Sequence, residues 1–169
     1  MNSAELLTEA FARIRGLVAN SVDGLTPEEL ALRPNDEGNS IAWLVWHLTR
    51  IQDDHIADVA GKPQVWLSKG WADRFALPLD PSDTGYGHTS EQVSAVRPQS
   101  GDLLLGYHDA VYEQTVRYLQ NLLDVDLDRV VDTSWDPPVT LGARLISVIS
   151  DDLQHSGQAA YAAGLLKLS

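Results

Sequence analysis

Two acidic residues precede a histidine near the C-terminal end of the sequence. Asp151 lies four residues before His155, and Asp152 lies three residues before it. Residues three or four apart share one face of a helix, so either carboxylate can lie beside the imidazole and help to bind one metal ion. The same spacing is also typical of an ordinary hydrogen bond or a solvated ion pair. The spacing alone therefore does not establish a metal site, and it does not decide which of the two aspartates would be a ligand.

A catalytic metal ion typically takes three protein ligands and keeps one position for water or substrate, so another helix must supply a ligand. His47 and His55 lie in an apolar segment with helical period. His55 falls within the stripe that contains Ile41 and Leu44, whereas His47 falls at its edge, so periodicity predicts that His55 is the more buried. A histidine in an apolar stripe, such as His55 or His108, is also typical of a hydrogen-bonded core residue.

The donor set and the missing cysteine together define the chemistry to expect. Two imidazoles and one carboxylate suit zinc, nickel or iron(II), of which we predict zinc. Such an ion lowers the pKa of a bound thiol or water and so creates a nucleophile at neutral pH. The chain contains no cysteine, which excludes disulfides, zinc–thiolate sites and a cysteine nucleophile. Any thiol must therefore come from another molecule.

Four long segments with the period of amphipathic helices must position these residues. The caps and the apolar spacing predict helices over residues 3–22, 40–60, 101–123 and 141–166, with a short capped helix after Thr26. Residues 63–98 are rich in proline and glycine, and they predict an excursion with short helices, one of them over 90–96. No persuasive strand pattern is present. The sequence predicts an all-α four-helix bundle that forms a single domain over residues 1–169.

Charge and composition argue against several classes of partner. The chain has 12 Lys+Arg and 24 Asp+Glu, a formal net charge of −12, whereas nucleic acids and anionic membranes attract basic surfaces. No run of about 18 apolar residues is present, so we predict no membrane span. The N-terminus does not read as a signal peptide, and we expect a soluble, cytoplasmic protein.

Two phrases carry a resemblance to a known family along essentially the whole chain. Asn-Ser-Ile-Ala-Trp-Leu-Val-Trp-His-Leu (39–48) and Gln-His-Ser-Gly-Gln (154–158) are similar to those of the DinB superfamily of metal-binding four-helix bundles. The blocks at 70–75 and 84–89 resemble the actinobacterial branch that includes mycothiol-dependent enzymes. The resemblance implies that His47 and His155 are ligands. It places Asp151 at the third position, which is most often His and is a carboxylate in the mycothiol-dependent isomerase branch.

The resemblance also implies a function. We expect a metal-dependent S-transferase or isomerase that delivers mycothiol, or another small thiol, to a small electrophile, and we expect a homodimer. A metal-dependent hydrolase and a non-catalytic, metal-binding or stress-associated bundle are the alternatives. Asp54 or Gln158 would orient a ligating imidazole. Aromatic residues of the excursion either wall the pocket or pack the excursion onto the bundle: Trp66, Trp71, Phe75, Tyr86 and His88.

Overall fold

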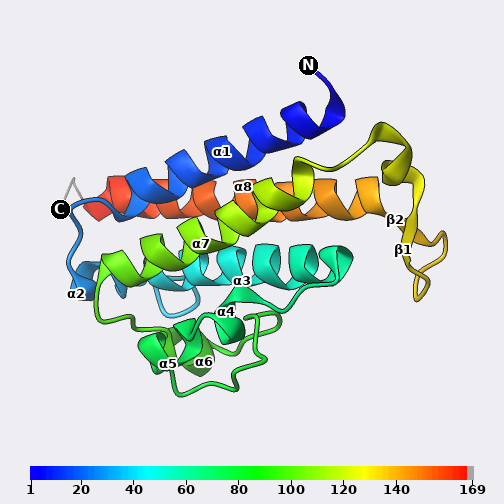
Figure 1. Cartoon of the computed structure of the whole chain (residues 1–169). Helices are drawn as coiled ribbons and strands as arrows, with labels where there is room; N and C mark the ends of the chain where they lie inside the picture. Colours follow the sequence, from blue (N-terminus) through cyan, green and yellow to red (C-terminus); the bar gives the residue numbers. More distant parts are fainter. Residues whose placement is uncertain (167–169) are drawn as a thin grey trace.

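Four long helices form the body of the molecule in the computed structural model, which describes residues 1–166 (Figure 1). They are α1 (Ser3–Val22), α3 (Ile41–Ala60), α7 (Gly101–Leu119) and α8 (Leu141–Leu166). Helix α8 packs against α1 and α3, and α7 also packs against both of these helices. The predicted all-α four-helix bundle is confirmed.

Local capping chemistry sets the start of α2 (Pro27–Leu30) and both ends of α3. The Ser40 hydroxyl accepts a hydrogen bond from Trp43 N and starts α3, and Gly61 ends α3 in the left-handed conformation at φ 60°. Thr26 and Glu29 form a capping box around α2, with proline at the first helical position. These contacts satisfy backbone groups that a helix end otherwise leaves unpaired.

The excursion contains three short helices, α4 (Val65–Ser68), α5 (Trp71–Phe75) and α6 (Ser90–Ala95). A buried carboxylate fixes its start, because Asp53 of α3 accepts hydrogen bonds from Val65 N at 2.8 Å and Trp66 N at 2.7 Å. The Tyr107 hydroxyl of α7 donates to the same carboxylate at 2.8 Å. The excursion is therefore attached to two helices of the bundle.

Two parts of the connection between α7 and α8 differ from the prediction. Helix α7 ends at Leu119 rather than near residue 123, and a short 3₁₀ helix, η1 (Asp124–Asp128), follows. Strands β1 (Val130–Asp132) and β2 (Val139–Thr140) then form an antiparallel hairpin, although no strand was expected. Segments of two or three residues are too short to show the alternation by which a strand is recognised.

Apolar side chains fill the space between the four helices. The buried set includes Phe11, Ile14, Leu48, Val111 and Leu145. Amphipathic helices of this kind bury one face and leave the other in solvent. Within residues 1–166, none of the helices combines the length and the apolar character needed to cross a membrane.

Candidate metal centre

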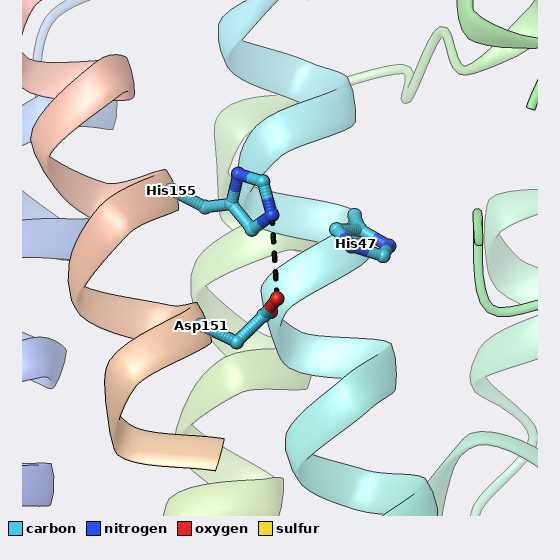
Figure 2. A group of neighbouring side chains, drawn as sticks. All are labelled: His47, Asp151 and His155. Atoms are coloured by element: carbon cyan, nitrogen blue, oxygen red, sulfur yellow. Dashed lines mark ion pairs between the residues drawn. The ribbon is translucent and has the colours of Figure 1, made fainter. Parts of the chain in front are cut away.

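The structure brings together one histidine of α3 and an acid–histidine pair of α8 (Figure 2). One potential ligand atom from each of His47, Asp151 and His155 lies within 4.8 Å of the other two. His155 Nε2 is 3.5 Å from Asp151 Oδ1, as the four-residue spacing on one helix allows. All three residues predicted as ligands therefore meet in one place.

The chain holds the His47 ring by one nitrogen, by a stacked aromatic ring and by a closely packed glycine. Nδ1 lies 2.6 Å from the carbonyl oxygen of Thr84, so this nitrogen donates its proton and Nε2 is the free ring nitrogen. The Trp43 ring stacks on the imidazole with a centroid distance of 4.5 Å. Gly85 packs against it so closely that an added Cβ would lie 2.7 Å from Nδ1. The imidazole is thus fixed before any ligand binds.

The burial of the two α3 histidines is the reverse of the prediction. His47 is 5% exposed, whereas 27% of the His55 side chain is exposed. The helical wheel was wrong because it considers α3 alone, whereas the segment around Thr84 covers the edge of the helix at His47. His55 Nδ1 instead lies 3.0 Å from Arg144 Nη1 and stands outside the group of candidate ligands.

A side-chain amide holds His155 in the corresponding way. Its Nδ1 lies 3.0 Å from Gln158 Oε1, so Nδ1 donates and Nε2 is left facing Asp151. Gln158 was one of the two residues predicted for this role. The other, Asp54, accepts a hydrogen bond from Gln64 Nε2 at 2.6 Å. An acceptor on the far nitrogen is the usual partner of a metal-ligating imidazole.

The protonation states in this group are set by opposing effects. Burial lowers the pKa of His47 and outweighs the hydrogen bond to Thr84. Burial also lowers the pKa of His155, but its interactions with Asp151 and Gln158 are larger together, so the pKa of His155 is raised. For Asp151, burial raises the pKa, while the contact with His155 and the charges of the histidines lower it to a net decrease. Asp151 is therefore ionised at neutral pH.

These residues fit a divalent metal ion. Both imidazoles donate through Nδ1 and keep Nε2 available, and Asp151 Oδ2 is buried without a hydrogen-bond partner among the described residues. A buried carboxylate oxygen without a partner is costly, and a cation would satisfy it. A set of two imidazoles and one carboxylate suits zinc, nickel or iron(II).

Asp152, the alternative third ligand, does not belong to the group of candidate ligands. Its side chain is fully buried, and neither carboxylate oxygen has a hydrogen-bond partner among residues 1–166. Burial raises the pKa of Asp152 well above its usual value, and the neighbouring charge of Asp151 raises it further. Asp152 is outside the group formed by His47, Asp151 and His155.

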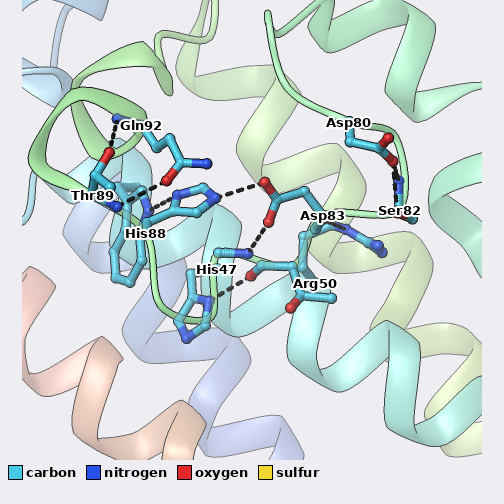
Figure 3. Close-up of polar contacts among 11 residues, drawn as sticks. His47, Arg50, Asp80, Ser82, Asp83, His88, Thr89 and Gln92 are labelled. Carbon is cyan, nitrogen blue, oxygen red and sulfur yellow. Dashed lines mark hydrogen bonds and ion pairs between the residues drawn. The ribbon is translucent and has the colours of Figure 1, made fainter.

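A polar network that the sequence did not predict positions the segment over His47 (Figure 3). The buried Arg50 guanidinium donates from Nε to the Asp83 carbonyl oxygen at 3.0 Å. The Asp83 carboxylate accepts from Gly85 N at 2.9 Å and lies 2.8 Å from His88 Nε2. His88 Nδ1 in turn accepts from Trp43 Nε1 at 3.0 Å. A charged Arg50 within an otherwise apolar stretch of α3 was the available signal.

The aromatic residues of the excursion mainly pack it onto the bundle. Trp66 and Phe75 are buried, and their ring centroids lie 4.9 and 6.0 Å from that of Tyr107. Trp71 also contacts Tyr107, at 5.9 Å between ring centroids. Tyr86, by contrast, is 89% exposed. The packing alternative is therefore the correct one for the first three aromatic residues.

Comparison with known proteins agrees with the geometry. Residues 6–166 match the family described as "MST: Mycothiol-S-transferase". A solved structure described as the conserved protein of locus from Enterococcus faecalis is 32% identical to the chain. It superposes with a TM-score of 0.93, and the match covers 100% of this chain and 99% of that one. No curated protein matches the sequence.

Proposed function

The chain belongs to the mycothiol-S-transferase family, and on this premise we propose that it is a metal-dependent enzyme that transfers mycothiol, or another small thiol, to a small electrophile. The observation that carries the metal dependence is the meeting of His47, Asp151 and His155 within 4.8 Å. In a chain without cysteine, a cation at this point is the means of activating a thiol supplied by another molecule.

These three residues would hold the ion, which we expect to be zinc, with nickel or iron(II) as alternatives. The bound ion would act as a Lewis acid that lowers the pKa of the thiol. His47 and His155 offer Nε2, because the Thr84 carbonyl and the Gln158 amide occupy the Nδ1 protons. Asp151 supplies the negative charge, since its pKa is lowered and it is ionised at neutral pH.

The rest of the chain restricts how the site can move. Trp43 stacks on the His47 ring, and Gly85 packs closely against its Nδ1. Arg50 anchors the segment that carries Thr84 and Gly85. A ligand set held in place before substrate arrives loses little freedom on binding, which favours catalysis. In the transfer, the thiol gives up its proton to solvent and the sulfur forms a bond to the electrophilic carbon, while the leaving group departs with the electron pair of the bond that breaks.

The direct test is the consumption of mycothiol in the presence of 1-chloro-2,4-dinitrobenzene. In this reaction chloride leaves as the S–C bond forms, and the product absorbs light. We expect turnover by zinc-loaded protein, a fall to the uncatalysed rate after chelation, and recovery when zinc is restored. His47→Ala should be inactive, whereas His55→Ala, which removes a histidine outside the group, should remain active.

Other outcomes of this assay would contradict the proposal in different ways. Equal rates before and after chelation would show that the reaction does not depend on the metal. Zinc-loaded protein that consumes no thiol with any of several electrophiles would contradict thiol transfer, and would favour hydrolysis or a non-catalytic bundle.

A further inference from the structure

A cleft of about 280 Å³ lies beside the candidate metal centre. The loop 34–39 forms one wall, Leu44 of α3 contributes to the lining, and Gln158, Tyr161 and Ala162 of α8 form the other wall. Gln158 connects the two sites directly, because its Oε1 is the partner of His155 Nδ1. The face of α8 that carries the candidate ligands thus continues into this cleft, since residues three and four apart share a face.

Loop 34–39 is held in one conformation by Arg33. The guanidinium donates from Nε to the Gly38 carbonyl at 2.6 Å and from Nη2 to the Asp36 carbonyl. Its Nη1 donates to the hydroxyls of Ser90 and Ser94 in α6, at 2.9 and 2.7 Å. An arginine that bonds two carbonyls of one loop and a neighbouring helix fixes the loop as a rigid wall. Binding residues on loops are commonly positioned by such a scaffold.

The polar side chains on the two walls are not used by the fold. Within residues 1–166, the side chains of Glu37, Asn39 and Tyr161 form no hydrogen bond, and Tyr161 is 70% exposed. Gln158 uses only its carbonyl oxygen on His155, so its amide nitrogen remains a donor. The cleft therefore presents amide donors and acceptors, one carboxylate and one exposed phenol ring.

The composition of the lining selects a class of ligand. Among residues 1–166, no lysine, arginine or histidine lines the cleft, and the chain has a net charge of −12, so an anionic group is disfavoured there. Neighbouring hydroxyls of a ligand ring can donate to Glu37 and both donate to and accept from the amides of Asn39 and Gln158. The ring itself can lie against Tyr161. Uncharged, polyhydroxylated rings have both properties.

We propose that this cleft binds the uncharged, polyhydroxylated part of the thiol substrate, with the sulfur on the side of His155. This inference rests on the proposed function, which requires a thiol at the neighbouring centre. Mycothiol meets the requirement, because its thiol-bearing group is attached to a sugar–inositol unit without net charge. The cleft, rather than the metal ligands, would then select mycothiol over simple thiols.

The test measures binding of S-methyl mycothiol by isothermal titration calorimetry, because a methylated sulfur isolates the contribution of the sugar–inositol unit. Asn39→Ala and Tyr161→Ala should each raise Kd by about tenfold, the effect of losing roughly 1.4 kcal/mol of contacts. The matched controls are Asn20→Ala on α1 and Trp135→Ala, a 67% exposed aromatic side chain between β1 and β2. Both controls should bind as the wild type does.

A variant that lacks one candidate metal ligand distinguishes failure of this inference from failure of the proposed function. His47→Ala should bind S-methyl mycothiol with a Kd within about twofold of the wild type, because the cleft does not include that residue. Such binding without thiol transfer by the wild type would contradict the proposed function and retain the cleft assignment. No binding by the wild type, or equal losses in Tyr161→Ala and Trp135→Ala, would overturn the cleft assignment even if transfer occurs.

Discussion

At the scale of single residues, the five histidines differ in what their ring nitrogens contact. His47 and His155 each donate through Nδ1 to an oxygen and keep Nε2 beside Asp151 or free. Both nitrogens of His88 have partners, and His55 contacts Arg144. His108 is buried in the core with Nδ1 on Thr49. Hydrogen bonding therefore separates His55 and His88 from the candidate ligands. His108 also has an Nε2 without a partner within residues 1–166, and it differs because it lies outside the group of candidate ligands.

Substitution of the two neighbouring aspartates should affect metal affinity differently. Asp151→Asn removes a charged oxygen donor, so we expect the Kd for zinc to rise at least about tenfold. Asp152→Asn replaces a carboxyl that lies outside the ligand group with an amide of similar size, and zinc affinity should be unchanged. Competition with a chromogenic chelator measures both affinities. A large loss in Asp152→Asn alone would reassign the third ligand to Asp152.

His108 makes a pH-dependent contribution to stability. Burial lowers its pKa to about 4, while the unfolded chain titrates near 6.5. The unfolded state therefore binds more protons between these values, and His108 makes the protein less stable as the pH falls from 6.5 to 4. Relative to His108→Gln, the wild type should lose about 1.4 kcal/mol per pH unit, and about 3 kcal/mol in all.

Urea unfolding of the wild type and of His108→Gln between pH 4 and 7 measures this difference. The comparison is necessary because buried Asp152 has a raised pKa and contributes with the opposite sign in both proteins. A difference in unfolding free energy between the two proteins that does not change with pH would contradict this account, because it would show that His108 binds protons equally in the folded and unfolded states.

At the scale of elements, the sequence predicted what local chemistry determines. The caps at Ser40 and Thr26 and the left-handed Gly61 set the helix ends, and each is recognisable from residue type. The end of α7 and the β1–β2 hairpin were missed, because neither has enough residues to establish a period. Spacing indicated His155 with Asp151 or Asp152 as candidate ligands, whereas the choice of His47 and of Asp151 came from the family resemblance. The helical wheel had favoured His55 over His47 as the more buried.

The segment from Asp83 to His88 shows how an element with no regular structure can position a candidate ligand, His47. Gly85 has φ 90° and its added Cβ would lie 2.7 Å from His47 Nδ1, whereas Gly87 has φ 72° and open space. Gly85→Ala should therefore destabilise the fold by about 1–3 kcal/mol and weaken zinc binding.

Gly87→Ala is the matched control, because it introduces a similar left-handed strain without touching the histidine. It should cost about 1 kcal/mol of unfolding free energy and leave zinc affinity unchanged. Thermal unfolding and chelator competition measure the two effects. Equal zinc affinity in both variants would contradict the role assigned to Gly85.

At the scale of the whole molecule, the excursion explains what the sequence could not predict. The segment around Thr84 covers His47, and the buried Arg50 and Asp53 attach the excursion to the bundle through contacts with residues 12 or more positions away. Periodicity within one helix contains no information about such contacts. The predicted homodimer also depends on contacts outside one chain, and it stays a prediction for light scattering to test.

Metal binding should stabilise the whole fold. The ligands come from two helices that meet only in the folded chain, and the unfolded chain has no cysteine to compete for zinc. Free zinc at about 100 times its Kd should therefore add about 2.7 kcal/mol to the unfolding free energy. The thermal midpoint of the wild type should rise with zinc, and that of His47→Ala should not. Equal shifts in both proteins would place the binding site elsewhere.

The most direct measurement is the metal content of protein purified without a metal-affinity resin. Elemental analysis should find about one divalent ion per chain in the wild type and in His55→Ala, and none in His47→Ala or His155→Ala, because three ligands bind one ion. A wild type that takes up no zinc, nickel or iron(II) even when these are supplied would contradict the assignment. Retention of the ion in both His47→Ala and His155→Ala would contradict it as well.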